Sequence, residues 1–257
     1  NMTIVVEKLS NHIGVQINNF DCSKQLDVVE VKKINQIIQK HHFICFKNQK
    51  INGESLAQFT KNFGDLEAYP EKDKTKGKIE IFNVSNVSED GEHLSPDDQR
   101  VILQKNNSRW HTDSSYRYFP SIFSVLYGQE TLPLDATGGQ TQFSNMLLAY
   151  KSLPEDKKIL LEPLHQVHSY NDIRRLEPGL PELTQSEKSN FPPVTHPVIR
   201  VHPDRDHQKS LYFTSNTSLE IGGMGLEEGR NLHKWLVDYI SKEKFCYKHF
   251  WEINDLI

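Results

Sequence analysis

The feature that most constrains the fold is a change of pattern near Lys78. From this residue onward, apolar and β-branched residues occur in short runs, and the turns between them are rich in Pro, Gly, Asp and Asn. Such an arrangement is typical of a sheet sandwich or barrel. The runs are, in order, KIEIFNVSNV (78–87), SIFSVLYGQE (121–130), HPVIRVHP (196–203) and KSLYFTSN (209–216).

Helical patterns precede and interrupt these runs. Residues Val28 to His42 carry apolar side chains at helical spacing and lead into HFICFKN, which has the composition of a short buried strand. Ser55 to Phe63 predicts a second helix, with Gly64 at the position of a C-terminal cap. Three further helices are expected, over 145–153, over 155–161 after Pro154, and over 226–240.

Length and charge narrow the class of protein. The chain has 257 residues, with 36% hydrophobic and 25% charged residues, which is a globular composition. Its net charge of −4 comes from well-mixed acids and bases, and the densest cationic stretch, KDKTKGK (72–78), reads as a solvated loop. We therefore expect no nucleic-acid partner. Because no apolar run approaches the roughly twenty residues of a membrane span, we expect no membrane partner either.

Cysteine usage and the N-terminus bear on location. Cys22, Cys45 and Cys246 are odd in number and far apart, without a CxxC pair. This argues against a disulfide framework or a zinc ribbon and favours a reducing compartment. No signal peptide is visible at the start of the chain. We predict a cytoplasmic protein and leave self-association open.

The organisation of the chain suggests one domain over 1–257, since neither an internal repeat nor a low-complexity linker divides it. The chain ends in KFCYKHFWEINDLI, which is apolar and aromatic up to its last residue. A core strand needs neighbours on both sides. We therefore expect that this domain lacks its C-terminal segment here.

A candidate metal motif lies at His111-Thr112-Asp113. On a β-strand, residues i and i+2 point to the same side, so H-x-D can aim two ligands of a 2-His-1-carboxylate site at one metal ion. The motif alone is weak, because twelve histidines make chance matches common. His202-Pro203-Asp204 is a second match, but HPDRDHQK reads as a polar hairpin turn. The bland alternative for His111 and Asp113 is a paired His and Asp on a surface strand.

The surroundings of this motif resemble a known family. WHTDSSYRYFPSIFSVLYGQETLPLDATGGQTQFSNMLLAY is similar to the metal-binding region of the taurine dioxygenase and 2,4-dichlorophenoxyacetate dioxygenase family. GVQINNFDCSKQL, HFICFKNQKI, KNFGDLEAY, HPVIRVHPDRDHQKSLYF and FCYKHFWEINDLI resemble other segments of that family in the same order. This resemblance implies a double-stranded β-helix, a cupin-like jelly-roll barrel with helices outside, which agrees with the β runs above.

The resemblance also implies an activity. The family hydroxylates small organic, mostly anionic, substrates with O2, using Fe(II) and 2-oxoglutarate and releasing succinate and CO2. It implies that His111 and Asp113 are metal ligands and that the third ligand is a His about nine residues beyond Ile257. His249 aligns with a family position that is not a ligand, and His233 reads as structural.

Further site residues are implied in the same way. Thr141, in GGQTQF, would donate its hydroxyl to a carboxylate of 2-oxoglutarate, although Gln140 stands where the family usually has an acid. Tyr69 and Asn107 resemble substrate-pocket residues, and Thr217 takes the place of an aromatic of the taurine enzyme. Each of these has an ordinary alternative, as a strand, packing or surface residue.

Two rival functions stay open at this point. One is a non-catalytic, small-anion-binding jelly-roll protein that has lost its third metal ligand. The other is a zinc or other metal hydrolase that uses the same His111 and Asp113, which the lack of a constellation rich in His and Cys disfavours.

Overall fold

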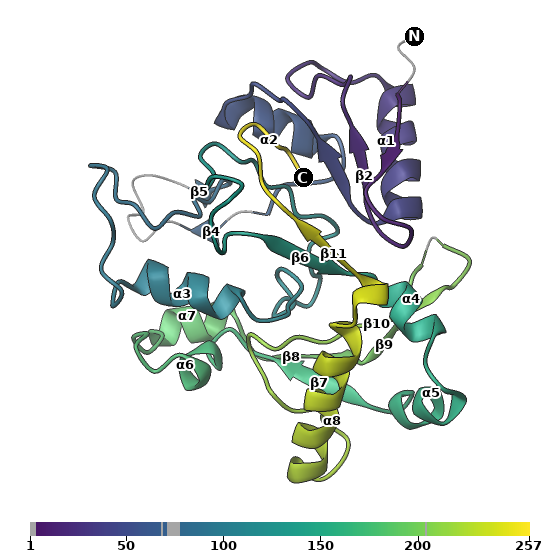
Figure 1. The fold of residues 1–257 in the computed structure, drawn as a ribbon. Coiled ribbons are helices and arrows are strands. Elements are labelled where there is room, and N and C mark those ends of the chain that lie inside the picture. The colour runs from purple at the N-terminus through teal and green to yellow at the C-terminus, as the bar shows by residue number, and fades with distance from the viewer. Residues whose placement is uncertain (1–3, 68, 71–77, 204) are drawn as a thin grey trace. The chain divides into compact units, whose positions relative to one another are not determined.

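A computed structural model describes the chain except for residues 1–3, 68, 71–77 and 204 (Figure 1). Most of the predicted loop 72–78 and Asp204 of the second H-x-D therefore lie outside the described residues. The chain divides into two compact units. The first comprises 1–82, 122–145 and 242–257, and the second comprises 83–121 and 146–241.

The first unit begins with a three-stranded sheet and a helix. Strands β1 (Glu7–Lys8) and β2 (Val15–Ile17) pair antiparallel, and β2 pairs in parallel with β3 (Ile44–Phe46). A parallel pair needs a crossover connection, and α1 (Val28–His41) supplies it (Figure 1). This confirms the predicted helix and the strand after it. The boundaries follow from a capping box of Asp27 with Glu30 and from the left-handed backbone of His42, with φ 66°.

The second helix, α2, spans Gly53–Lys61 and begins two residues before the predicted start at Ser55. The reason is the side chain of Asn52, which accepts a hydrogen bond from the Ser55 backbone and acts as the N-cap. The prediction of Gly64 as C-cap is wrong, because the helix ends at Lys61 and its C-cap is Asn62, which has a right-handed conformation. Strands β4 (Tyr69–Pro70) and β5 (Lys78–Ile79) follow as a short antiparallel pair.

The end of the chain completes this unit. Strand β6 (Thr141–Ser144) pairs antiparallel with β11 (Cys246–His249), which follows the short 3-10 helix η1 (Glu243–Phe245). Leu256 then bridges Phe46 on one side and Tyr127 on the other. The predicted strand 121–130 is thereby reduced to a bridge at Tyr127. The buried core has these residues: Ile4, Val15, Ile17, Phe20, Cys22, Leu26, Ile34, Ile37, Ile44, Phe46, Phe59 and Leu256.

The second unit combines short helices with two antiparallel hairpins. Strand β7 (His165–His168) pairs with β8 (Val194–Pro197), and β9 (Ile199–Val201) pairs with β10 (Lys209–Leu211). The helices are α3 (Gln99–Asn107), α4 (Met146–Lys151), α5 (Glu155–Leu161), α6 (Ile173–Leu176), α7 (Gln185–Asn190) and α8 (Leu226–Ile240). The helices predicted over 155–161 and 226–240 are thus confirmed with their predicted bounds, and the helix predicted over 145–153 is shorter, at Met146–Lys151.

The run HPVIRVHP serves both hairpins rather than forming one strand. Its backbone changes partners at Val198, whose N–H donates to Leu164 while its carbonyl accepts from Tyr212. Residues 202–203 and 205–208 connect β9 to β10, and the N–H of His202 donates to the carbonyl of Gln208. For these described residues, the prediction of a hairpin turn is confirmed.

Helix α8 packs tightly on the loop before it. Gly229 is required there, because a Cβ at this position would overlap the carbonyl oxygen of Ile221. This approach buries Leu232, His233 and Leu236 on the inner face of the helix. The helix therefore brings one histidine side chain into the interior of the unit.

The strands are short throughout. The ladders among the described residues make one three-stranded and four two-stranded sheets, none of them closed into a barrel. Over the same part of the chain, no helix combines the length and the apolar character needed to cross a lipid bilayer.

Candidate functional site

The backbone before His111 is anchored from two sides within the second unit. The carbonyl of Trp110 accepts a hydrogen bond of 2.7 Å from the Ser215 N–H, and the indole N–H donates to the Ser241 hydroxyl at 2.8 Å. His233 on α8 holds the same region, since its Nε2 lies 3.0 Å from the Thr214 carbonyl oxygen. The fold therefore fixes the chain immediately ahead of the H-x-D motif. The structural role predicted for His233 agrees with this position.

The motif itself is not on a strand, so that prediction is wrong. His111 and Thr112 lie in an irregular segment, and Asp113 begins a turn. Ser114 has a left-handed backbone, with φ 57°, and its carbonyl accepts from the N–H of Arg117. A strand needs a continuous ladder partner, and the left-handed residue ends the extended conformation at once.

The two side chains nevertheless face each other. Nε2 of His111 lies 3.3 Å from Oδ1 of Asp113, and Nδ1 lies 2.7 Å from the carbonyl oxygen of Arg109. Because a carbonyl only accepts, Nδ1 carries the proton of the neutral ring, and the lone pair of Nε2 is directed to the side of the carboxylate. This carbonyl is the kind of partner that orients histidine ligands in metal sites.

The spacing of these atoms suits a metal ion. Imidazole nitrogen and carboxylate oxygen bind a divalent ion such as zinc at about 2.0–2.2 Å, so two donors at right angles around an ion are about 3 Å apart. The observed 3.3 Å separation of His111 Nε2 and Asp113 Oδ1 is close to that value. The side chains are 25% and 51% exposed, respectively, so an ion can reach them from solvent. The donor set therefore fits a bound ion.

The same contacts determine the protonation of His111 in the metal-free state. Burial of the ring lowers its pKa, but the hydrogen bonds to Asp113 and to the Arg109 carbonyl outweigh this effect and raise the pKa above its usual value. A bound metal ion would take the place of that proton.

A buried histidine holds the loop after the motif. Nε2 of His196 lies 2.9 Å from the carbonyl oxygen of Ser115 and 3.2 Å from that of Arg117. Both partners only accept, so Nε2 is protonated and donates to them. Burial lowers the pKa of His196, so the ring is neutral at pH 7. This residue was not predicted from the sequence, because a single His on a short strand gives no sign of its partners.

A second histidine is buried beside it. The rings of His168 and His196 are 5.0 Å apart, and His168 is fully buried. Burial, then the nearby His196 and Arg200, lower the pKa of His168 to about 3. This unit therefore keeps two neutral imidazoles near the loop that follows Asp113.

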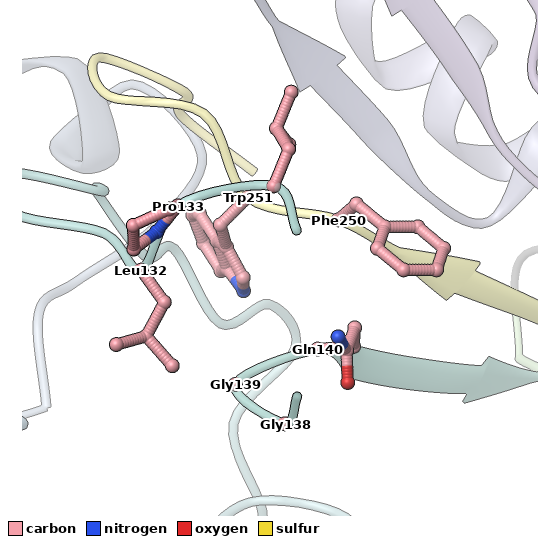
Figure 2. A pocket seen from close by; sticks show the side chains of 8 residues that line it. Leu132, Pro133, Gly138, Gly139, Gln140, Phe250 and Trp251 are labelled. Atoms are coloured by element: carbon pink, nitrogen blue, oxygen red, sulfur yellow. The ribbon is translucent and has the colours of Figure 1, made fainter. Parts of the chain in front are cut away.

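Thr141, the predicted cosubstrate residue, lies in the first unit at the start of β6, opposite His249 of β11. Its hydroxyl oxygen accepts a hydrogen bond of 2.9 Å from the indole N–H of Trp251. Next to it, Gln140 and Trp251 help to line a pocket of about 20 Å³, with room for about one water molecule (Figure 2). The other lining residues are Leu132, Pro133, Leu134, Gly138, Gly139 and Phe250.

The residues predicted to contact substrate are placed less fully. Tyr69 is in β4 of the first unit, and its side chain lies outside the described part of the chain. Asn107 is the exposed last residue of α3 in the second unit. Its neighbour Asn106 is buried instead, and donates from Nδ2 to the Asn216 carbonyl at 3.0 Å. Thr217 is also buried.

One other cluster has the composition of a metal site. Ligand atoms of Cys45, His249 and Asp255 lie within 4.8 Å of one another, and all three residues are buried. However, the ammonium of Lys47 is 2.6 Å from Oδ1 of Asp255 and already supplies the positive charge. Burial, then Asp255, raise the pKa of Cys45 to about 12, so it is a neutral thiol and a poor ligand.

The same network places His249. Its Nε2 is 3.0 Å from Oδ2 of Asp255 inside the first unit. Burial raises the pKa of Asp255, but the hydrogen bonds from His249 and Lys47 outweigh it and lower the pKa below its usual value. We therefore interpret this cluster as a structural ion network, in line with the prediction that His249 is not the third ligand.

Comparisons with known proteins identify the family of this chain. The model of the family "Taurine catabolism dioxygenase TauD, TfdA family" matches residues 6–257. An alpha-ketoglutarate-dependent 2,4-dichlorophenoxyacetate dioxygenase of Burkholderia sp. (strain RASC) is 30% identical over 260 residues, covering 100% of this chain and 86% of its own. An (S)-phenoxypropionate/alpha-ketoglutarate-dioxygenase of Sphingobium herbicidovorans is 27% identical, covering 95% of this chain and 80% of its own.

A solved structure shows the same fold. The crystal structure of AAD-2 in complex with Mn(II) and N-oxalylglycine has a TM-score of 0.85 and 32% identity, covering 99% of this chain and 86% of that one. N-oxalylglycine mimics 2-oxoglutarate in that complex. The chain therefore belongs to the TauD/TfdA family, whose members are oxidoreductases that use Fe(II) and 2-oxoglutarate as cofactor and cosubstrate and act on small organic substrates.

Proposed function

We propose that His111 and Asp113 are two of the ligands that hold Fe(II) in this dioxygenase. The observation that carries the proposal is the 3.3 Å separation between His111 Nε2 and Asp113 Oδ1, with Nδ1 bonded to the Arg109 carbonyl. The lone pair and the carboxylate are then directed to one point. The hydrogen bonds that anchor Trp110 fix the backbone on one side of this point, and those from His196 fix it on the other.

The cosubstrate is held through Thr141 in this proposal. A hydroxyl that donates to a carboxylate oxygen forms a charge-assisted hydrogen bond, which suits a terminal carboxylate of 2-oxoglutarate. When bound, iron and 2-oxoglutarate supply the oxidative chemistry that consumes O2 and yields succinate, CO2 and a hydroxylated product. The residues of the chain bind and orient these groups and exclude water from them.

The substrate is a small organic anion in this proposal. Support comes from the names of two relatives, which act on 2,4-dichlorophenoxyacetate and (S)-phenoxypropionate, both carboxylates at neutral pH. Tyr69 and Asn107 are the candidate substrate contacts, by the resemblance described above. A double-stranded β-helix as the fold is supported by the likeness to AAD-2. The rival function, a non-catalytic anion-binding barrel, has no relative among these matches that favours it.

The second H-x-D motif provides a matched control for the ligand assignment. His111→Ala should abolish 2-oxoglutarate-dependent succinate formation by the full-length protein, because removing a ligand costs most of the metal affinity. His202→Ala, in the exposed hairpin turn, should leave succinate formation unchanged. The measurement is succinate released per unit time at saturating Fe(II) and 2-oxoglutarate. Succinate formation that survives in the His111 variant would refute the assignment.

Four features remain predictions. They are a third histidine ligand beyond Ile257, the single domain, the cytoplasmic location and any self-association. The third ligand is the one that decides between an active enzyme and the rival function.

A further inference from the structure

The hydrogen bond between Thr141 and Trp251 has a defined donor, and this affects how Thr141 can bind the cosubstrate. The indole N–H can only donate, so the Thr141 hydroxyl oxygen must accept the 2.9 Å hydrogen bond. A hydroxyl can accept and donate at the same time, and its own hydrogen is then left for another acceptor. Among the described residues, no side chain or backbone oxygen is found to take that hydrogen. The Thr141 hydroxyl can therefore donate its hydrogen to a bound ligand.

The indole is itself fixed by its surroundings in the first unit. Its Cε3 lies close to Gly128, where an added Cβ would be 3.0 Å from that atom. The ring of His249 meets the indole edge to face, with centroids 5.0 Å apart and an angle of 81° between the planes. Figure 2 shows the Trp251 side chain between Pro133 and Gln140, at the wall of the small pocket. The direction of its N–H is therefore set by packing on several sides.

The buried network of His249, Asp255 and Lys47 fixes the His249 ring that packs against the indole. Nε2 of His249 lies 3.0 Å from Oδ2 of Asp255, and Oδ1 of Asp255 forms an ion pair with the Lys47 ammonium at 2.6 Å. Asp255 is fully buried, and Lys47 is only 12% exposed. A ring held by a buried charge cannot rotate freely, so it gives the indole a rigid neighbour.

We propose that Trp251 is a positioning residue for 2-oxoglutarate. Its N–H occupies an acceptor site of the Thr141 hydroxyl, turns the hydroxyl hydrogen away from the indole, and presents it to a carboxylate oxygen of the cosubstrate. A hydroxyl that accepts one hydrogen bond is polarised and becomes a stronger donor in the next. The proposal rests on the cosubstrate role of Thr141 given above, and it adds a residue that acts through that hydroxyl without touching the ligand.

The test is a double-mutant cycle read by ligand binding. The dissociation constant of 2-oxoglutarate is measured by calorimetry on the full-length protein, loaded with Mn(II) and kept free of oxygen. Thr141→Val should raise it roughly ten- to a hundredfold, since a hydrogen bond to a charged group is lost. Trp251→Phe should raise it roughly three- to tenfold in the wild-type background, and less than about twofold in the Thr141→Val background. Mn(II) affinity should be unchanged throughout.

Two further variants keep the test decisive. Trp235→Phe removes an indole from α8, where it stacks on Tyr239 at 5.1 Å, and should not alter the dissociation constant. If Trp251→Phe does not fold, β-(3-benzothienyl)alanine at position 251 keeps the shape of the indole and lacks only the N–H donor. It should reproduce the loss of affinity expected for Trp251→Phe.

The outcomes separate this inference from the proposal beneath it. A weaker binding of 2-oxoglutarate in Trp251→Phe that disappears in the Thr141→Val background supports the positioning role. Equal weakening in both backgrounds would assign Trp251 to packing and overturn the inference. A strong effect of Thr141→Val with none of Trp251→Phe would overturn the inference alone. No effect of Thr141→Val would remove the cosubstrate role of Thr141, and the inference with it.

Discussion

Two histidine–aspartate pairs, one in each unit, have similar geometry and very different surroundings. His111 and Asp113 are 3.3 Å apart, with side chains 25% and 51% exposed. His249 and Asp255 are 3.0 Å apart, with side chains 4% and 0% exposed, and Lys47 lies against the second carboxylate. Short distance alone therefore does not distinguish a metal site from a structural ion pair.

The surroundings make that distinction. A carboxylate that is fully buried must be compensated, and Lys47 and His249 do so by hydrogen bonds that hold the end of the chain in the core. At the other pair, the Arg109 carbonyl fixes the tautomer of His111 and leaves Nε2 directed at Asp113. The second partner of each pair differs accordingly: it is the Lys47 ammonium at Asp255 and the Arg109 carbonyl at His111.

Replacing each aspartate by alanine should give the largest difference between the two pairs. Asp113→Ala should lower Fe(II) affinity by more than about 100-fold and abolish succinate formation, because loss of a ligand exceeds the cost of losing an outer partner. The free energy of unfolding without metal should change by less than about 0.5 kcal/mol, since the side chain is half exposed. Metal titration, turnover and urea unfolding measure the three quantities. Unchanged turnover would contradict the assignment.

Asp255→Ala should show the opposite pattern. It leaves the buried Lys47 and His249 without their carboxylate, which should cost about 3–5 kcal/mol of the free energy of unfolding. Urea unfolding of the metal-free protein measures this loss. At a temperature where the variant is folded, its Mn(II) affinity should stay within about threefold of that of the wild type, well short of the roughly 10–100-fold cost of losing even an outer partner of a metal ligand. A stable variant that had lost its metal site would reverse the two roles.

The pH dependence of stability should reveal a third environment, that of His168. Its pKa is about 3 in the folded protein and near 6.5 in the unfolded chain. Below pH 6.5 the unfolded chain therefore binds a proton at His168 that the folded protein does not bind. As the pH is lowered from 6.5 to 3, the free energy of unfolding decreases by about 1.4 kcal/mol per pH unit. Between pH 6.5 and pH 5, the decrease in the free energy of unfolding should be about 2 kcal/mol smaller in His168→Phe than in the wild type. Equal losses in urea unfolding at the two pH values would contradict this.

The smallest effect is expected at His196, which contacts the backbone of the loop after the proposed ligands His111 and Asp113. His196→Leu removes the donor to the carbonyls of Ser115 and Arg117 and should lower Mn(II) affinity about tenfold, as loss of an outer support typically does. His196→Gln can donate from a similar position and should recover most of that affinity. If both variants bind Mn(II) alike, the loop does not depend on this hydrogen bond.

Sequence alone could predict the elements in which local signals and packing agree. Helix α1 has an apolar face together with a capping box at Asp27, and strand β3 is an uninterrupted apolar run, so both were predicted near their observed bounds. The run 196–203 was predicted as one strand, because nothing in its composition shows that Val198 changes partners between two hairpins.

Some residues of the candidate site were likewise proposed from the sequence, and others were not. His111, Asp113 and Thr141 were proposed from short motifs in a recognisable context, although the H-x-D motif was placed on a strand that the left-handed Ser114 prevents. His196, Trp251 and Lys47 were missed, because each acts on a residue far away in the sequence. Such contacts arise only from the tertiary fold, so a local pattern cannot indicate them.

A Co(II) titration of the full-length protein, followed by visible absorption in the absence of oxygen, tests most directly whether His111, and not His249, is a metal ligand. Wild type, His111→Gln and His249→Gln are compared, so that one histidine of each pair is replaced by a side chain that can still form a hydrogen bond. We expect that tight Co(II) binding is lost in His111→Gln and retained in His249→Gln. Tight binding that survives in the first variant and disappears in the second would contradict it.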